Sequence, residues 1–333
     1  MTVPTNLYQK ATLKGNREDL MDKIFNTSHN ETPITSAMGR VTAITDFHEW
    51  QTDSLAAASA ANKMIDGDDV TLDAQVATVR IGNHLQIFNG SVGVSRRANI
   101  VKKAGRTMEM GYLKGKKMLE LKRNIEAMVL SPTQVAIAAT TSVAGQSGGL
   151  GVQCVSNPLH GGAGATAAWT SGAPTAAVTG GTNRTFTKAL LDTACQNIYT
   201  TSGQFAEMLV VSPAHKVLFS AFSGIAQNRF EVKTKQQQGT VVAGADVYMS
   251  DFGSLSVVPH YLMSGGDTAY VLNTDYLDMA CRQIEAAATA SSYIPTTGTS
   301  ATRAADVAYV DVATWLPALS MTNATFYVEA LAN

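Results

Sequence analysis

One serine has the sequence surroundings of a catalytic nucleophile. Gly145, Ser147 and Gly149 satisfy the G-x-S-x-G pattern, in which a strained turn between a strand and a helix exposes the serine hydroxyl to substrate. We expect no helix after Ser147, because the chain continues into Gly151 and a short apolar run within its most glycine-rich part. A serine hydrolase that uses Ser147 is therefore kept only as an alternative function.

No other group of residues completes a catalytic or metal-binding motif. His48 and Glu49 begin like a zinc-protease helix, but the second histidine that would bind the metal one turn later is missing. Residues 161–166 have the glycines of a phosphate-binding loop without its lysine. The six histidines are isolated, and the three cysteines lie far apart. We therefore predict a protein that is not an enzyme and that uses no cofactor or metal.

The composition argues against a membrane protein and against a strongly basic nucleic-acid binder. The 333 residues are 45% hydrophobic but only 15% charged, and the formal net charge is −1. No apolar run approaches the ~20 residues that cross a bilayer, and the N-terminus lacks the apolar core of a secretory signal. Because soluble proteins carry roughly 25% charged residues, so little charge suggests a surface that a partner covers. We expect assembly in a cytoplasm.

The first part of the chain predicts an arm, a protruding loop and a long helix. Residues 1–40 are polar and irregular apart from a short helical candidate at 17–25, which suggests an arm outside the core. Residues 41–95 contain short β-type runs on either side of a turn at 66–69, which predicts an extended two-stranded loop. Apolar residues then recur at helical spacing through 99–130 and predict one long amphipathic helix.

Glycines raise a separate question about that helix and the segment after it. Gly105, Gly111 and Gly115 are either tolerated imperfections or points where another backbone packs closely, and the sequence does not choose between the two. Residues 136–182 are rich in Ala, Gly, Thr and Ser and are too long for an ordinary connection. We expect this segment to be a surface excursion.

The rest of the chain predicts a packed α/β unit. Thr187 can cap a helix to about Thr201, residues 208–211 form an apolar strand, and Pro213 begins a second helix that reaches Phe222. The chain as a whole is expected to have a mixed α+β fold. Further strands are predicted at 240–243, 246–249, 255–258, 269–272, 307–313 and 325–330.

Several stretches of sequence resemble one protein family. Residues 15–20 (GNREDL), 32–34 (TPI) and 48–55 (HEWQTDSL) resemble the SU-ten-like major capsid proteins of tailed bacteriophages, and the likeness continues through 248–253 (YMSDFG). The resemblance covers most of the chain. It weakens toward the C-terminus, where residues 289–302 are rich in Ser, Thr and Ala in place of a charged stretch.

The resemblance implies a structural role and a Hong Kong 97-type fold. Such a protein self-assembles into pentamers and hexamers of an icosahedral or prolate head shell around double-stranded DNA, with a portal and a scaffold or decoration protein as further partners. It is located in the virion after assembly in the bacterial cytoplasm. A minor or decoration virion protein is a second alternative. The implied regions are an N-terminal arm at 1–40, an extended loop at 41–95, a peripheral domain at 96–202 with a spine helix at about 99–130 and a glycine-rich loop at 136–182, an axial domain at 203–290, and a return to the peripheral domain at 291–333.

Two segments carry opposite charge. Residues 96–123 contain ten basic and two acidic residues, a local charge of +8, whereas residues 41–75 contain seven acidic residues and one lysine, a local charge of −6. We hypothesise that the acidic loop of one copy lies across the basic helix of the next. Alternatively both faces are solvated, or the basic helix faces packaged DNA. The candidate contact residues are Phe47 and Trp50, as aromatic anchors, with Glu49, Asp53, Asp66, Asp68, Asp69, Arg96, Arg97, Lys102, Lys103, Arg106, Lys114, Lys116 and Lys117.

Overall fold

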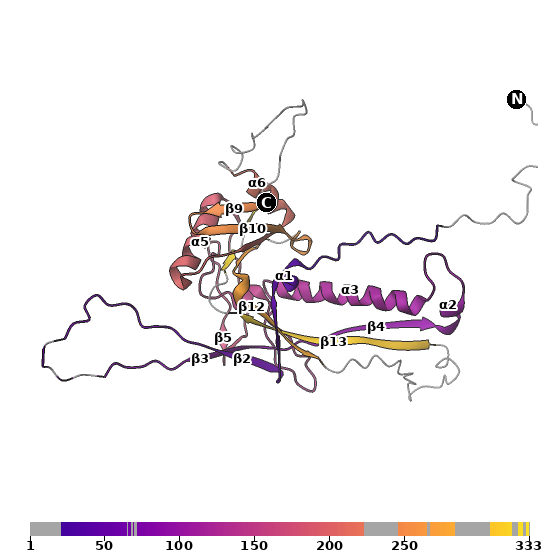
Figure 1. Ribbon diagram of the computed structural model, residues 1–333, viewed down its shortest axis with the longest axis horizontal. Helices are drawn as coiled ribbons and strands as arrows, with labels where there is room; N and C mark the ends of the chain where they lie inside the picture. The colour runs from indigo at the N-terminus through magenta and orange to yellow at the C-terminus, as the bar shows by residue number, and fades with distance from the viewer. Residues whose placement is uncertain are drawn as a thin grey trace, which may run out of the picture.

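The computed structural model describes residues 21–64, 66–67, 69, 72–222, 246–264 and 267–283, together with the backbone of three C-terminal strands. These strands are β13 (Val307–Met321), β14 (Phe326–Val328) and β15 (Leu331–Ala332). Figure 1 shows an elongated molecule, with a long helix over a sheet on one side, a thin two-stranded loop on the other, and a compact unit above the middle.

A long sheet and one helix form the first layer. The sheet has the order β1 (Gly39–Thr42), β12 (Leu277–Gln283), β13 and β4 (Phe88–Ser95), in which only β1 and β12 are parallel. The helix α3 (Glu109–Leu130) runs along β4 and β13 (Figure 1). A Cβ atom at Gly90 would lie 2.9 Å from Cγ of Lys117, so the glycine allows strand and helix to approach closely.

The compact unit contains a five-stranded sheet and two helices. Its strand order is β14, β11 (Ala269–Leu272), β8 (Met208–Val211), β10 (Gly253–Pro259) and β9 (Val247–Ser250). The helices are α5 (Lys188–Ser202) and α6 (Pro213–Ser220). The hydroxyls of Thr187 and Ser212 accept hydrogen bonds from the first turns of these helices, which confirms the predicted helix, strand and helix.

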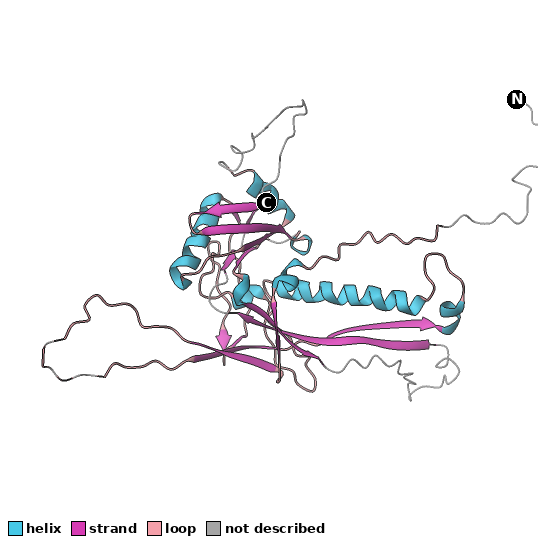
Figure 2. Ribbon diagram, viewed as in Figure 1, coloured by secondary structure: helices cyan, strands magenta, loops and turns pink. Residues whose placement is uncertain are grey.

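The two-stranded loop extends away from both sheets. Its base is the antiparallel pair β2 (Phe47–Thr52) and β3 (Val79–His84), and the described residues between them form no helix or strand (Figure 2). Gly67 has a φ of +84° at the predicted turn, a conformation that glycine adopts without steric cost. The predicted two-stranded protrusion is therefore confirmed.

Short elements complete the architecture. The helices α1 (Pro33–Ala37), α2 (Arg96–Ile100) and α4 (Leu150–Gln153) and the 3₁₀ turns η3 (Tyr261–Met263) and η4 (Thr274–Tyr276) surround α3 and the sheets. Two further strand pairs are β5 (Trp169–Thr170) with β6 (Ala173–Pro174), and β7 (Arg184–Thr185) with β15.

The apolar core has two main parts. One lies around the C-terminal half of α3 and includes Met128 and Leu150, and the other lies against α5 and α6 and includes Leu191 and Phe219. The fully buried Tyr270 of β11 donates its hydroxyl to the carbonyl oxygen of Leu130 over 2.9 Å. This hydrogen bond ties the compact unit to the C-terminal end of α3.

The glycine-rich segment at 136–182 lies only partly at the surface, so the prediction of a surface excursion was wrong for residues 147–154, which are buried. Leu150 and Val152 are fully buried within it. A Cβ at Gly149 would lie 2.3 Å from the carbonyl oxygen of Ser131, and one at Gly151 would lie 2.5 Å from Cα of Pro132. The glycines here allow backbones to pack against each other, although parts of the segment such as 138–144 are exposed.

The single helix predicted at 99–130 is divided in two. Ile100 ends α2 and Glu109 begins α3, and in the non-helical loop between them Gly105 has a left-handed φ of +75°. A Cβ at Gly111 or Gly115 would meet nothing within 4 Å. No described part of the chain therefore packs against these two glycines, so within one copy they are tolerated imperfections.

The N-terminal arm also differs from expectation. Residues 21–25, the described part of the helical candidate at 17–25, are not helical. From Pro33 the arm enters the core as α1, where Ile34 is 1% exposed, so placing all of 1–40 outside the core was wrong.

Two strands cross the expected boundaries between regions. β4, within 41–95, pairs with β13 beside α3, and β14, within 291–333, joins the sheet of the compact unit. The division into named domains stays a prediction. The strand expected at 240–243 and the stretch 289–302 lie outside the described residues.

Candidate interaction surfaces and a buried polar junction

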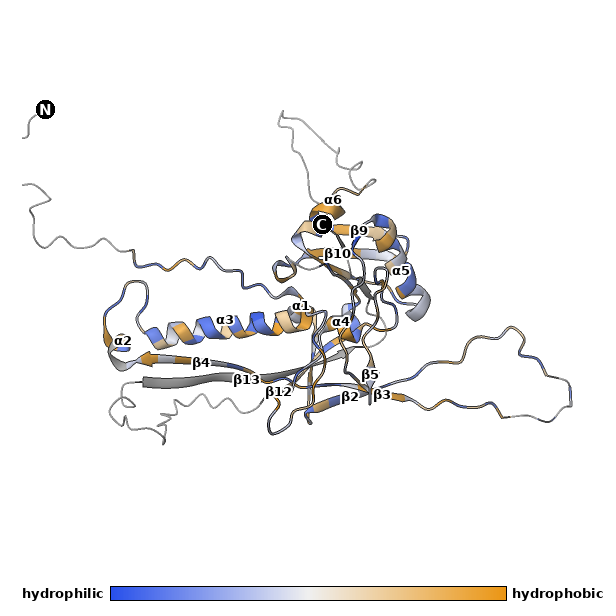
Figure 3. Cartoon of the chain, turned by 180° about the vertical axis from the view of Figure 1, so that it is seen from behind, coloured by the Kyte–Doolittle hydropathy of each residue, from blue (hydrophilic) through white to orange (hydrophobic). Residues whose placement is uncertain are grey.

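The basic residues lie on α2, on the loop after it and on the first turns of α3. Lys102 and Lys116 are exposed, and hydrophilic residues recur along α3 in Figure 3. Arg96 and Arg97 belong to α2, but their side chains lie outside the described part of the structure. The partly buried members of the set are Lys103, Arg106, Lys114 and Lys117.

Some of this positive charge is paired within the chain. The Glu109 carboxylate accepts from Nε of Arg106 over 2.6 Å and lies 3.5 Å from Nζ of Lys103, and the hydrogen bond from Arg106 is the main cause that lowers the pKa of Glu109. Lys117 bonds Glu120 over 2.7 Å and is the main cause that lowers the pKa of Glu120. The charge left at the surface includes Lys102 and Lys116, so the basic face is smaller than the local charge suggested.

The acidic residues line the exposed loop between β2 and β3. Asp53, Asp66 and Asp69 are exposed, and Asp68 lies outside the described residues. Glu49 at the base of the loop forms an ion pair with Arg80 on the opposite strand. The same loop exposes large apolar side chains. Leu55 is 99% exposed, Leu72 95% and Val76 84%.

Phe47 and Trp50 lie on β2 and are half-buried within their own chain. The Phe47 ring packs against His84 with 4.5 Å between ring centroids, and Trp50 lies opposite Ile81 in the register of β2 and β3. These contacts belong to the base of the loop and leave part of each ring accessible. Their role as anchors of an intermolecular contact stays a prediction.

The acidic and basic segments lie at opposite ends of the molecule. In Figure 1 the loop between β2 and β3 extends to the left, whereas α2 and the N-terminal end of α3 lie at the far right. The two segments therefore do not contact each other within one copy. Their opposite charges can meet only between two copies.

Ser147 does not have the geometry of a nucleophile. A short helix, α4, does follow it, so the expectation that no helix follows was wrong. However, Ser147 is 0% exposed, and its Oγ has no hydrogen-bond partner among the described residues. Its backbone binds the side chains of Gln86 and Gln134. A buried hydroxyl without a neighbouring base cannot reach a substrate, so the structure gives no support to the hydrolase alternative.

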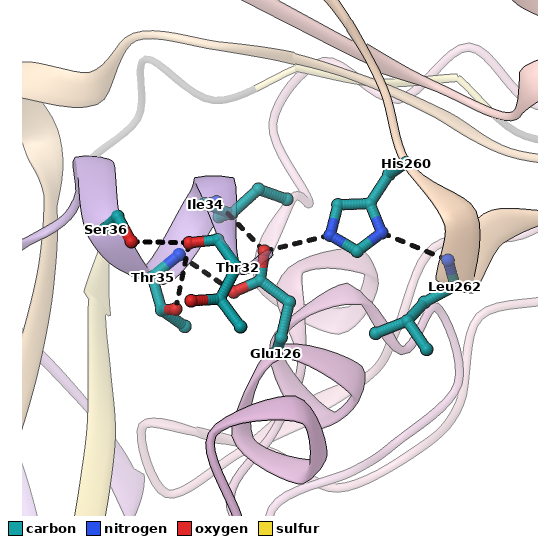
Figure 4. Close-up of polar contacts among 7 residues, drawn as sticks. All are labelled: Thr32, Ile34, Thr35, Ser36, Glu126, His260 and Leu262. Carbon is teal, nitrogen blue, oxygen red and sulfur yellow. Dashed lines mark hydrogen bonds and ion pairs between the residues drawn. The ribbon is translucent and has the colours of Figure 1, made fainter. Parts of the chain in front are cut away.

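One fully buried carboxylate joins three segments of the chain (Figure 4). Glu126 of α3 is 0% exposed, and its two oxygens accept from the backbone N–H groups of Ile34 and Thr35 in α1, each over 2.9 Å. Oε1 also lies 3.0 Å from Nε2 of His260, the residue before η3. The carboxylate therefore connects the N-terminal arm, α3 and the compact unit.

His260 is held in one tautomer. Its Nδ1 accepts from the backbone N–H of Leu262 over 3.2 Å, so Nε2 carries the proton and donates it to Glu126. Burial raises the pKa of Glu126, but the hydrogen bonds from His260, Thr35 and Ile34 outweigh that effect and lower the pKa overall. The junction is thus a neutral histidine and two backbone amides around an ionised carboxylate.

Aromatic contacts surround this junction. The Tyr261 ring stacks on His260 and on His29 of the arm, each with 5.1 Å between centroids, and the Arg123 guanidinium lies 5.7 Å from the Tyr261 ring. Farther along the arm, Asp22 accepts from the backbone N–H of Gly105 over 3.2 Å. The described arm therefore has attachments at both ends of α3.

Sequence reasoning missed this junction. In the sequence His260 is one of six isolated histidines, and nothing there distinguishes it from the other five. Glu126 had one available signal, a carboxylate within the otherwise apolar end of the helix pattern, between Ile125 and Met128. The three donors that make the burial tolerable could not be read from the sequence.

The remaining features do not add a catalytic site. A cavity of about 420 Å³ adjoins the end of α3, and its one carboxylate, Asp267, accepts from Nδ2 of Asn183 over 3.0 Å. In the described ranges no group of three or more His, Cys, Asp or Glu residues could hold a metal ion. No helix among these residues is long and apolar enough to cross a membrane.

Comparison with known sequences gives one family over most of the chain. The model of the family described as "SU10 major capsid protein" matches residues 5–307. A curated protein named "Major capsid protein" from Escherichia phage Phieco32 is 31% identical over 131 residues, which are 39% of this chain and 37% of that protein. The matched region thus spans little more than a third of the curated relative.

Solved structures resemble the fold over its whole length. The structure titled "Cyanophage A-1(L) capsid asymmetric unit" aligns with a TM-score of 0.60 at 12% identity, over 99% of this chain and 100% of that chain. A chain from Gordonia phage Cozz aligns with a TM-score of 0.58 at 10% identity, over 100% and 99%. At such low identity these likenesses concern the fold alone.

Proposed function

We propose a shell-building role from one premise: this chain belongs to the SU10 major capsid protein family and has the Hong Kong 97-type α+β fold of phage capsid proteins. As a major capsid protein it is a structural component of the virion. In this role, copies of the chain associate into the pentamers and hexamers of an icosahedral or prolate head shell.

The proposed partners follow from that role. The main partner is a further copy of the same chain, and packaged double-stranded DNA is bound without sequence specificity. A portal and a scaffold or decoration protein complete the set. Assembly takes place in the cytoplasm of the bacterial host.

The proposal for how copies associate rests on the positions of the two oppositely charged segments. The acidic loop and the basic surface of α2 and α3 lie at opposite ends of one copy (Figure 1). A contact between the loop of one copy and the helix of the next is heterologous, and such contacts close into rings when the rotation between copies permits. The charge pattern thus favours head-to-tail association in a capsomer.

Apolar side chains on the same loop strengthen this argument. Leu55, Leu72 and Val76 are almost fully exposed, and Met108 and Met118 of the basic region are 62% and 44% exposed. Burial of apolar surface contributes roughly 25 cal/mol per Å², so a contact that covers these side chains gains more than charge attraction. Each contact can be weak, because a subunit held by several neighbours gains from multivalency.

Charge reversal on the loop tests the contact. In the triple variant Asp66→Lys, Asp68→Lys, Asp69→Lys, we expect a folded subunit that forms neither capsomers nor shells, as measured by electron microscopy and sedimentation. The matched control is Asp251→Lys, an exposed aspartate in the compact unit, which should assemble normally. Normal shells from the triple variant would eliminate the loop as a charged contact.

A second variant separates this contact from the DNA alternative. We expect Lys102→Glu with Lys116→Glu to impair assembly alone and to restore shells when combined with the reversed loop, because the attraction is then inverted on both sides. If the lysine variant instead builds normal shells that package less DNA, the basic surface faces DNA. Copy number in purified particles separates a major capsid protein from the minor or decoration alternative.

A further inference from the structure

We propose that Glu126 and His260 form a latch that holds the N-terminal arm on α3 of its own copy, and that the latch opens when the Glu126 carboxylate is neutralised. The latch is a property of the single chain, so it does not depend on how copies associate. It determines whether the arm is attached or available to other surfaces.

The hydrogen-bond pattern makes the latch depend on charge. Glu126 accepts from the N–H groups of Ile34 and Thr35 and from Nε2–H of His260, and a hydrogen bond with the Thr35 side chain also favours its ionised form. A neutral carboxyl group accepts hydrogen bonds more weakly than a carboxylate, and among these partners only the Thr35 hydroxyl can accept its proton. His260 cannot become the acceptor by changing tautomer, because its Nδ1 already accepts from Leu262 N–H. Neutralisation therefore weakens the hydrogen bonds by which Glu126 holds α1.

Few other charged groups face the junction. The described elements α1 and α4 contain no charged residue, η3 contributes only the preceding His260, and α3 contributes Arg123 one turn before Glu126. His29 reaches the site from the arm through Tyr261. The lowered pKa of Glu126 means that the carboxylate stays charged in neutral solution, so the latch is closed there.

The rest of the arm is held weakly. Residues 21–31 are exposed, and the arm's attachments outside α1 include the stacking of His29 on Tyr261 and the hydrogen bond between Asp22 and Gly105. The arm also carries exposed apolar side chains, with Met21 67% and Phe25 64% exposed. When α1 detaches, the arm and these side chains become free to bind elsewhere, including on a second copy.

Hydrogen exchange on the full-length, unassembled subunit tests the latch. In Glu126→Gln, the side-chain amide places NH₂ hydrogens among the same donors, so we expect the amides of Ile34 and Thr35 to exchange about tenfold faster or more. The amides of β11 should keep their protection, which shows that the subunit remains folded. The matched control is Glu120→Gln, on the same helix but in a partly exposed pair, which should leave α1 unchanged.

Acid titration of the unmodified protein supplies a test without a variant. Between about pH 7 and about pH 3, and after correction for intrinsic exchange, the amides of Ile34 and Thr35 should lose protection before those of β11. The proposal is overturned if these amides stay protected in folded Glu126→Gln, or if in acid they open only together with β11. Neither measurement involves assembly, so failure here leaves the proposed shell contact untouched.

Discussion

The loop between β2 and β3 and the junction around Glu126 handle charged residues in opposite ways. Every described residue from 53 to 80 is exposed, and this loop carries both carboxylates and large apolar side chains at its surface. Glu126, in contrast, is fully buried and receives hydrogen bonds from two distant segments. The junction completes its contacts within one chain, whereas the loop is proposed to make its contacts with another copy. Substitutions at the two places should therefore affect different properties, stability at the junction and assembly at the loop.

The largest expected loss of stability comes from the core beside the junction. Leu150 is fully buried, and Leu150→Ala should lower the free energy of unfolding by about 2–5 kcal/mol, because it removes apolar contacts and leaves a cavity. Urea denaturation of the unassembled subunit measures this change. A loss below about 1 kcal/mol would mean that the glycine-rich segment is not packed as described.

The next largest effect is expected at Glu126 itself. Glu126→Gln should lower the free energy of unfolding by about 1–3 kcal/mol at neutral pH, since a buried donor is left unpaired. Glu120→Gln, which alters a partly exposed ion pair, should change it by no more than about 0.5 kcal/mol. Equal effects of the two substitutions would remove the distinction between the junction and the surface.

The stabilisation that Glu126 provides should depend on pH, and the lowered pKa of Glu126 fixes the direction of that dependence. Because the pKa of Glu126 is lowered in the folded state, its stabilisation is fully present above the unfolded value of about 4.3 and is lost as pH falls through the folded value. The difference in unfolding free energy between the unmodified protein and Glu126→Gln should therefore shrink in acid. A difference that grows in acid would contradict the assignment of an ionised carboxylate.

A smaller effect of opposite sign is expected on the open face of α3. Gly115→Ala should raise the free energy of unfolding by about 0.5–1 kcal/mol, because alanine favours the helix and a Cβ there meets nothing within 4 Å. The assembly of this variant tests the alternative that another backbone packs closely against Gly115. If the more stable variant assembles poorly, another copy approaches α3 closely at this position.

The smallest effect on stability is expected on the loop. Leu72 is 95% exposed, so Leu72→Ser should change the free energy of unfolding by less than about 0.5 kcal/mol. Assembly yield should nevertheless fall, because a neighbour would lose apolar contact. A large loss of stability, or unchanged assembly, would show that the loop does not depend on a partner in the way proposed.

Local pattern predicted much of the secondary structure. The helix α5 begins after the expected cap, Thr187, and α6 begins at the expected Pro213, while β8, β10 and β11 lie where short apolar runs indicated strands. These features depend on residues only a few positions apart, which the sequence displays directly. The family resemblance of residues 15–55 and the Hong Kong 97-type fold were likewise available from the sequence, and the family match confirms that resemblance.

Errors occurred where distant segments decide the outcome. The glycine-rich segment has the composition of a surface loop, yet Gly149 and Gly151 pack against the backbone of residues 131 and 132. Likewise α1 enters the core because its amides reach Glu126, 91 and 92 residues away. Neither contact leaves a periodic signal in the chain.

By itself, the sequence determined the family, the α+β class and the two segments of opposite charge, because these depend on local composition and spacing. Only the tertiary structure decided that the charged segments lie at opposite ends and that Glu126 is buried among donors. The physical reason is that a charge is tolerated inside a protein only when hydrogen bonds replace its water, and here the donors come from residues far away in the chain.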